Sequence, residues 1–269
     1  MNRIVKKFSD LKKTKSKALV IFITAGDPSL KKTEELALAF EKEGVDLIEL
    51  GVPFSDPLAD GPVIQASSQR SLQRGTNLKK ILQTVANIRK KSLIPLVLMS
   101  YLNPLWHHGL ELFARQAKKA GVDGVIIPDL PPEEGAGIAG VLRRQGLSLV
   151  YLLAPTSSAQ RQKSVARASS GFVYYVSLTG VTGARRELSK ELSKQLRAVK
   201  KVSKLPVCVG FGVSTPRQAH SAASAADGVI VGSAVVRALN EQPRLSAQQA
   251  AQKIIRPFAR ALGKRSLRA

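Results

Sequence analysis

Residues 18–53 read ALVIFITAGDPSLKKTEELALAFEKEGVDLIELGVP, a complete strand–helix–strand pattern. The two ends, 18–26 and 45–53, are short apolar runs rich in β-branched residues without strict alternation, which is typical of parallel strands buried on both faces. Between them, 30–44 has the apolar spacing of an amphipathic helix and ends on Gly44, a common helix stop. The stretch therefore predicts a βα unit followed by the next strand of a parallel sheet.

The same pattern recurs along the rest of the chain. Six further apolar runs follow, separated by amphipathic stretches, at 94–101, 122–129, 147–155, 171–177, 205–212 and 226–233. Eight βα units in 269 residues predict an α/β fold, a single-domain (β/α)₈ TIM barrel spanning 1–269. We expect an extra N-terminal helix at 2–14 that plugs the barrel floor, and a frayed tail from about 263 to 269. An open doubly wound sheet is the alternative, but no G-x-G-x-x-G follows the first run.

The formal net charge of +23 raises the question of nucleic-acid binding. The Lys and Arg residues fall in the helical stretches between the apolar runs, without a zinc-finger or RNA-binding motif, so we interpret them as solvated helix faces and expect no nucleic-acid function. No stretch has the length of a signal peptide or a membrane span, and the single cysteine, Cys208, fits a core position in a cytoplasmic protein. The three histidines lack metal-ligand spacing, so no metal site is expected.

Barrel enzymes carry their chemistry at the carboxyl ends of the strands. Four of the few aromatic residues fall at such ends: Phe22, Tyr101, Tyr174 and Phe211. Core packing would explain any one of them, but together they predict a pocket for a flat apolar ligand.

Glycine-rich turns follow the last three runs, in LTGVTG, GFGVS and GSAVV. Glycine lets the backbone approach a ligand closely, and a helix starting at Ser233 would offer free N–H groups to an anion. The turns therefore predict a phosphate site.

The carboxylates complete the predicted site. Glu49 lies at the end of the second run, where burial should raise its pKa and suit it to acid–base catalysis. Asp60 follows in a loop held by Pro57 and Pro62, whereas Asp56 could equally cap that loop. Because none of the eight runs contains a lysine, Schiff-base chemistry is not expected. The pattern predicts acid–base catalysis on a phosphorylated substrate with an apolar ring.

The chain resembles the α subunits of tryptophan synthase over essentially its whole length. The resemblance rests on FITAGDPS, LIELGVPFSDPLADGPVIQ (47–65), LMSYLNP, GVIIPDLPPEE, YYVSLTGVTGAR, GFGVS and VGSAVV. It implies a lyase of tryptophan biosynthesis that cleaves indole-3-glycerol phosphate to indole and glyceraldehyde 3-phosphate. Glu49 would protonate the indole ring and help to deprotonate the side-chain hydroxyl, and Asp60 would stabilise positive charge toward the ring N–H.

The resemblance also implies the roles of the other site residues. Tyr174 matches the active-site tyrosine, and the ring pocket would comprise Phe22, Tyr101, Ile127 and Phe211. The phosphate site would comprise Gly183, Gly212, Gly232 and Ser233. The loop after the sixth run would close over the site, with its Thr182 contacting Asp60.

The resemblance implies a β subunit as the partner, in a cytoplasmic α₂β₂ complex that channels indole from one subunit to the other. It also implies that pyridoxal phosphate is bound by the β subunit and that this chain holds no cofactor. The matching contact segments are Pro53, Asp56 and the YLNP turn with Asn103 and Pro104. Two alternatives remain: a catalytically weak subunit that mainly activates β, or another phosphate-binding barrel enzyme. The chain departs from the family in its strong positive charge, which includes Arg185 and Arg186 in the closing loop.

Overall fold

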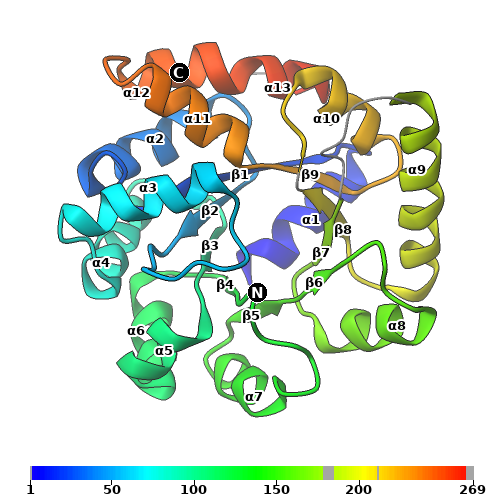
Figure 1. Ribbon diagram of the computed structural model, residues 1–269, viewed down its shortest axis with the longest axis horizontal. Helices are drawn as coiled ribbons and strands as arrows, with labels where there is room; N and C mark the ends of the chain where they lie inside the picture. Colours follow the sequence, from blue (N-terminus) through cyan, green and yellow to red (C-terminus); the bar gives the residue numbers. More distant parts are fainter. Residues whose placement is uncertain (1, 178–184, 211, 265–269) are drawn as a thin grey trace.

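The computed structural model describes residues 2–177, 185–210 and 212–264, with the backbone alone for 185–190. Parallel strands form a nearly closed barrel inside a ring of helices (Figure 1). The strands are β1 (Ala18–Thr24), β2 (Leu47–Gly51), β3 (Leu96–Met99), β4 (Gly124–Ile126), β5 (Ser148–Val150), β6 (Leu152–Leu153), β7 (Val173–Val176), β8 (Val207–Gly210) and β9 (Gly228–Val231).

The predicted barrel is confirmed, with one difference in its strands. The sheet order is β5-β4-β3-β2-β1-β9-β8-β7-β6, and the fifth apolar run supplies both end strands because it is interrupted at Tyr151. β5 pairs with β4, β6 pairs with β7, and the N–H of Tyr174 donates to the carbonyl oxygen of Tyr151 at 3.2 Å. One segment, 148–153, thus joins both edges of the sheet, which an open doubly wound sheet would not do.

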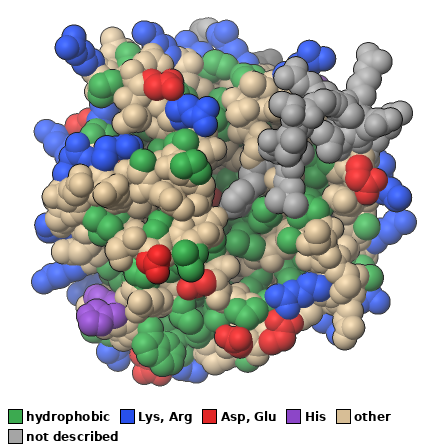
Figure 2. Space-filling view, viewed as in Figure 1, with side chains coloured by type: hydrophobic (Ala, Val, Ile, Leu, Met, Phe, Trp, Pro, Cys, Tyr) green, Lys and Arg blue, Asp and Glu red, His purple; other side chains and the backbone are tan. Residues whose placement is uncertain are grey.

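Helices cover the outside of the barrel. They are α2 (Leu30–Lys42), α3 (Pro62–Gln73), α4 (Leu78–Arg89), α5 (Leu102–His108), α6 (Leu110–Ala120), α7 (Ala136–Arg144), α8 (Ala159–Ala168), α9 (Arg185–Val202), α10 (Pro216–Ala223), α11 (Ser233–Glu241), α12 (Ala247–Ala250), the π-helix η1 (Ala251–Ile255) and α13 (Arg256–Ala261). In α2, the Ser29 side chain caps the first turn by accepting from the Lys32 N–H, and Leu36 and Phe40 are buried. Figure 2 shows Lys and Arg side chains mostly around the outline of the molecule, over these helices. On the face shown, the positive charge therefore lies on helix surfaces, as predicted.

The extra N-terminal helix, α1 (Arg3–Lys13), lies inside the ring of helices (Figure 1). Its apolar side chains Ile4, Phe8 and Leu11 are buried in one cluster with inward-facing strand residues, and the rings of Phe8 and Phe172 are 5.7 Å apart. A Cβ on Gly124 would lie 3.0 Å from Ile4 Cδ1, so glycine leaves room for this helix. The predicted plug at the barrel floor is confirmed.

The amino-terminal end of the barrel is held by carboxylates that stand just before strands. Asp46, Asp123 and Asp227 each accept a hydrogen bond from a backbone N–H of an adjacent strand. The donors are Leu19 at 2.8 Å, Leu96 at 3.0 Å and Val207 at 3.0 Å. These acids are structural, which leaves the carboxyl ends of the strands for chemistry.

The C-terminal segment of the chain also contacts the amino-terminal end of the barrel. Lys264 forms an ion pair with Asp46, and the remainder of the tail that was expected to fray lies outside the described residues. A single domain over 1–269 stays a prediction. Among the described residues, no helix is both long and apolar enough to cross a bilayer.

Candidate active site

Glu49 stands on the inner wall of the barrel. The strand register aligns it with Phe22 of β1 and Val97 of β3. It is fully buried, and neither carboxyl oxygen has a hydrogen-bond partner among the described residues. Since a carboxylate without partners is costly to bury, burial raises the pKa of Glu49 to about 8. At neutral pH the carboxyl therefore holds a proton that it can deliver.

Asp60 comes from the loop between β2 and α3, as predicted. Its carbonyl oxygen accepts from Gln65 Nε2 at 2.8 Å, and its carboxyl group is hydrogen-bonded to the Tyr101 phenol. Burial raises the pKa of Asp60 to about 6, while the Tyr101 hydrogen bond opposes the shift. Asp60 is thus mostly ionised at neutral pH, in contrast to Glu49.

Tyr101 fixes this loop to the barrel. Its hydroxyl oxygen accepts from the Ala59 N–H at 2.9 Å, and its ring centroid lies 5.4 Å from that of Phe54. Tyr101 is the N-cap residue of α5, whose first N–H, from Leu102, donates to the Asp129 carboxylate at 3.0 Å. The loops after β2, β3 and β4 are therefore linked, and Asp60 is positioned by two of them.

Tyr174 lies within the electrostatic influence of both acids. It is buried in β7, where burial raises the pKa of its phenol well above the usual value and the charges of Glu49 and Asp60 add to the shift. A Cβ on Gly210 of β8 would lie 2.5 Å from the Tyr174 hydroxyl, so glycine is needed beside it. The structure thus brings both predicted acids near one tyrosine.

The apolar part of the site includes residues that the sequence reasoning missed. Phe22 lies against Gly51 and Gly232, whose added Cβ atoms would be 2.5 Å and 3.4 Å from it. Met99 and Val176, which end β3 and β7, and Leu152, which begins the two-residue β6, are partly buried and pack against the inner cluster. The register pairs Leu152 with Tyr174 and Met99 with Gly51, so alternation outward from Glu49 would have been the signal to find them.

The predicted anion site lies beside Phe22. Gly232 is the N-cap residue of α11 and has no side chain to occupy the helix start, and its carbonyl accepts from the Val235 and Val236 N–H groups. The first N–H groups of a helix, here from Ser233 onward, have no partner within the helix. Gly212 adopts a φ of 80°, a conformation that favours glycine. An anion bound at α11 would therefore adjoin the ring pocket.

Several predicted residues are not brought into this group. Ile127 is buried just after β4 but belongs to the outer cluster between strands and helices, so its place in the ring pocket stays a prediction. Thr182, Gly183 and Phe211 lie outside the described residues. Within the described ranges, no three His, Cys, Asp or Glu side chains gather closely enough to hold a metal ion.

The segments expected to contact a partner follow β2 and β3, at the same end of the barrel as the two acids. Pro53 is buried and Asp56 exposed in the loop after β2, whereas the predicted YLNP turn is instead the first turn of α5, where Asn103 is exposed and Pro104 partly buried. Two exposed apolar residues were missed: Leu58 is 86% exposed and Trp106 67%. Figure 2 shows hydrophobic and histidine side chains together over α5. Leu58 lies in the same loop as Pro53 and Asp56, and Trp106 lies on the same helix as Asn103 and Pro104. The expected contact segments thus also carry exposed apolar side chains, which is typical of interaction surfaces.

Comparison with known proteins gives consistent matches. A family model described as "Tryptophan synthase alpha chain" matches residues 8–262. The tryptophan synthase alpha chain of Geotalea daltonii is 55% identical over 237 residues, covering 88% of this chain and 90% of the relative. The crystal structure of tryptophan synthase subunit alpha from Legionella pneumophila superposes with a TM-score of 0.90 at 40% identity, covering 98% of this chain and 99% of that one. A structure described as the tryptophan synthase α₂β₂ complex from Pyrococcus furiosus has a TM-score of 0.83 at 38% identity, covering 92% and 99%.

Proposed function

This chain belongs to the tryptophan synthase alpha chain family, whose reaction is the lyase cleavage of indole-3-glycerol phosphate, and we propose that Glu49 and Asp60 carry the acid–base steps of that reaction here. The observation that carries this assignment is the fully buried Glu49 carboxyl, unpartnered among the described residues, at the end of β2. A carboxyl group without hydrogen-bond partners holds no other part of the structure in place, and its raised pKa keeps it protonated at neutral pH.

The cleavage separates indole from glyceraldehyde 3-phosphate by breaking the bond between ring carbon C3 and the side chain. The Glu49 carboxyl donates its proton to C3, and positive charge develops toward the ring nitrogen. The electron pair of the breaking bond returns to the ring, while the side-chain hydroxyl next to it becomes the aldehyde and releases its proton. The Glu49 carboxylate takes up that proton, so it ends each cycle protonated as it began.

Asp60 acts as the ionised member of the pair. A carboxylate beside the ring N–H stabilises the positive charge that develops there in the transition state. Its pKa of about 6 keeps it charged at neutral pH, and Tyr101 holds it at the site. Two carboxyl groups with separated pKa values can thus divide the acid and electrostatic roles.

The remaining predicted residues bind the substrate in this proposal. The apolar ring would lie among Phe22, Tyr101, Ile127, Tyr174 and Phe211, with Met99 and Leu152 added from the structure. The phosphate would bind the α11 N-terminus through Gly232 and Ser233, with Gly183 and Gly212. Thr182 would contact Asp60 when the substrate is bound.

Indole release from indole-3-glycerol phosphate by the purified chain tests the assignment. Glu49→Gln keeps the shape of the side chain but removes the acid, and we expect kcat to fall by about 10²–10⁴-fold. Asp60→Asn should give a comparable loss. Asp56→Asn is the matched control, because it neutralises an exposed acid of the same loop and should leave the rate of the isolated chain unchanged. Parental activity in Glu49→Gln would refute the assignment.

A β subunit is the proposed partner, in an α₂β₂ complex that works in the cytoplasm. Pyridoxal phosphate belongs to the β subunit in this family, and none is proposed for this chain. Contact would run through Pro53, Asp56, Asn103 and Pro104, with Leu58 and Trp106 as exposed apolar anchors.

The partner surface can be tested with one substitution and a matched control. Leu58→Ser should weaken binding to a tryptophan synthase β subunit by at least about tenfold, since it removes an apolar anchor. Leu93→Ser removes a similarly exposed leucine, 74% exposed, from the opposite end of the barrel just before β3, and should bind normally. Equal affinity of both variants would exclude this surface, and unaltered β binding without indole release would indicate a chain that only activates β.

A further inference from the structure

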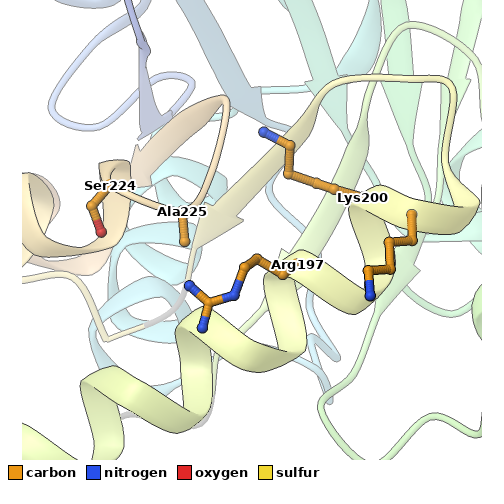
Figure 3. Close-up of a pocket in the computed structure, with 5 residues that line it drawn as sticks. Arg197, Lys200, Ser224 and Ala225 are labelled. Carbon is orange, nitrogen blue, oxygen red and sulfur yellow. The ribbon is translucent and has the colours of Figure 1, made fainter.

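A second group of cations lies at the opposite end of the barrel from the two acids. Arg197, Lys200 and Lys201 stand on one face of the last turns of α9, just before β8. Together with Ser224 and Ala225, which follow α10, they line a surface pocket of about 400 Å³. Figure 3 shows the Arg197 guanidinium extending from α9 toward Ala225.

The positive charge at this pocket is only partly neutralised. Lys200 forms an ion pair with Asp227 at 2.6 Å, and the same carboxylate also accepts from the Val207 N–H. Arg197 and Lys201 have no carboxylate partner among the described residues. Asp227 is thus already engaged, and two cations of the lining remain available.

A further cation, Lys17, adds to the excess of positive charge near the pocket. Lys17, just before β1, is partly buried and donates from Nζ to the Ala226 carbonyl at 2.6 Å. Burial lowers the pKa of Lys17, and the charge of Lys200 lowers it further against the opposing effect of Asp227. The cations therefore repel one another here, and a bound anion would relieve that repulsion.

The geometry points to a binding site for the phosphoryl group of a small molecule in this pocket. A guanidinium can bind two phosphate oxygens at once, and ammonium groups add point charge beside it. Arg197 and Lys201 are one helical turn apart, so both can reach the same compact anion. Residues 224–225 line the second side of the pocket, and its volume of about 400 Å³ suits a small ligand better than an extended polymer.

Inorganic pyrophosphate serves as the probe, with binding measured by calorimetry at about 150 mM salt, where interactions between exposed charges are largely screened beyond about 8 Å. Arg197→Gln with Lys201→Gln should weaken binding at this site by at least about tenfold. The matched control is Arg115→Gln with Lys119→Gln on α6, which removes the same two residue types at the same spacing from an exposed helix face. Neither double variant should change indole release, since both pairs lie away from the acids.

Amide NMR separates this site from the phosphate site at α11. Pyrophosphate should shift the Ser224 and Ala225 amide signals in the parent and the α6 control, but not in the α9 variant. The proposal is overturned if those signals do not move, or if both double variants lose affinity equally, which would mean unspecific attraction to net charge. It is also overturned if a single-stranded oligonucleotide moves these signals and pyrophosphate does not, because the ligand would then be a nucleic-acid backbone.

Discussion

Gly51→Ala tests how the ring pocket is built. Gly51 ends β2 two residues after Glu49, and its added Cβ would lie 2.5 Å from Phe22 Cζ and 2.8 Å from Cε2. An ordinary contact at this position is 3.4–4 Å, so the phenyl ring would have to move by about 1 Å. The Gly51 backbone is not in the left-handed region, so the substitution acts through this contact alone.

The expected cost follows from overpacking. Inserting a methyl group into a packed site costs about 1–3 kcal/mol. The ring can yield only by shifting within the pocket, so we expect the loss in substrate binding, with kcat/KM for indole release reduced about 10–100-fold, mainly through KM. Glu49 and Asp60 remain in place, so kcat should change less.

Gly137→Ala is the control for this experiment. Gly137 lies in α7, where an added Cβ meets nothing within 4 Å, and alanine should stabilise the helix by about 0.5–1 kcal/mol without altering catalysis. Steady-state kinetics and thermal unfolding of both variants provide the comparison. Normal KM in Gly51→Ala would show that Phe22 does not line the substrate pocket.

Three further predictions concern titration and stability. The kcat/KM of the isolated chain should rise with pH through about 6 as Asp60 ionises and fall through about 8 as Glu49 loses its proton; the lower limb should vanish in Asp60→Asn. Because folding raises the pKa of Glu49 from 4.5 to about 8, the folded state binds this proton more tightly and loses stability as pH rises between those values. At about pH 8.5, Glu49→Gln should therefore have a higher free energy of unfolding than the parent, by up to about 5 kcal/mol, and should unfold at a higher temperature. The difference should shrink as the pH is lowered toward about 4.5. A difference that does not change with pH would contradict the burial of a charge at this position. Asp123→Asn should cost about 3 kcal/mol in denaturant unfolding, because this buried carboxylate pairs with Arg3 and Arg89 and accepts from the Leu96 N–H; a change below about 1 kcal/mol would contradict that role.

The barrel could be predicted from sequence because its signals are local and repeated. Each βα unit carries its own apolar run and helix, and the eight repeats leave few other folds of this length. The break at Tyr151 could not be predicted, because residues 149–153 are a continuous run of Leu, Val and Tyr and pairing to two different neighbours is a property of the closed sheet.

The site could be predicted in part, because some of its residues are conspicuous in the sequence. Glu49 is a charge at the end of a buried run, which is conspicuous in any sequence. Met99 and Leu152 were missed because strands buried on both faces are apolar at every position, so hydrophobicity does not distinguish the residues that face inward. Alternation from Glu49 identifies them only when the pairing register between strands is also known. The contact between Asp60 and Tyr101 joins positions 41 residues apart, and the neighbouring hydrogen bond from Ala59 to Tyr101 joins positions 42 residues apart. Contacts of this separation require the folded barrel.

The central claim is that Glu49 enters the reaction as a neutral acid. Carbon-13 NMR of the glutamate carboxyl groups, assigned by comparison with Glu49→Gln, would follow its titration directly in the folded chain. The account predicts one carboxyl that remains protonated at neutral pH and titrates near 8. A Glu49 carboxyl that titrates near the ordinary value of 4.5 would contradict it, because Glu49 would then have no proton to give to the ring at neutral pH.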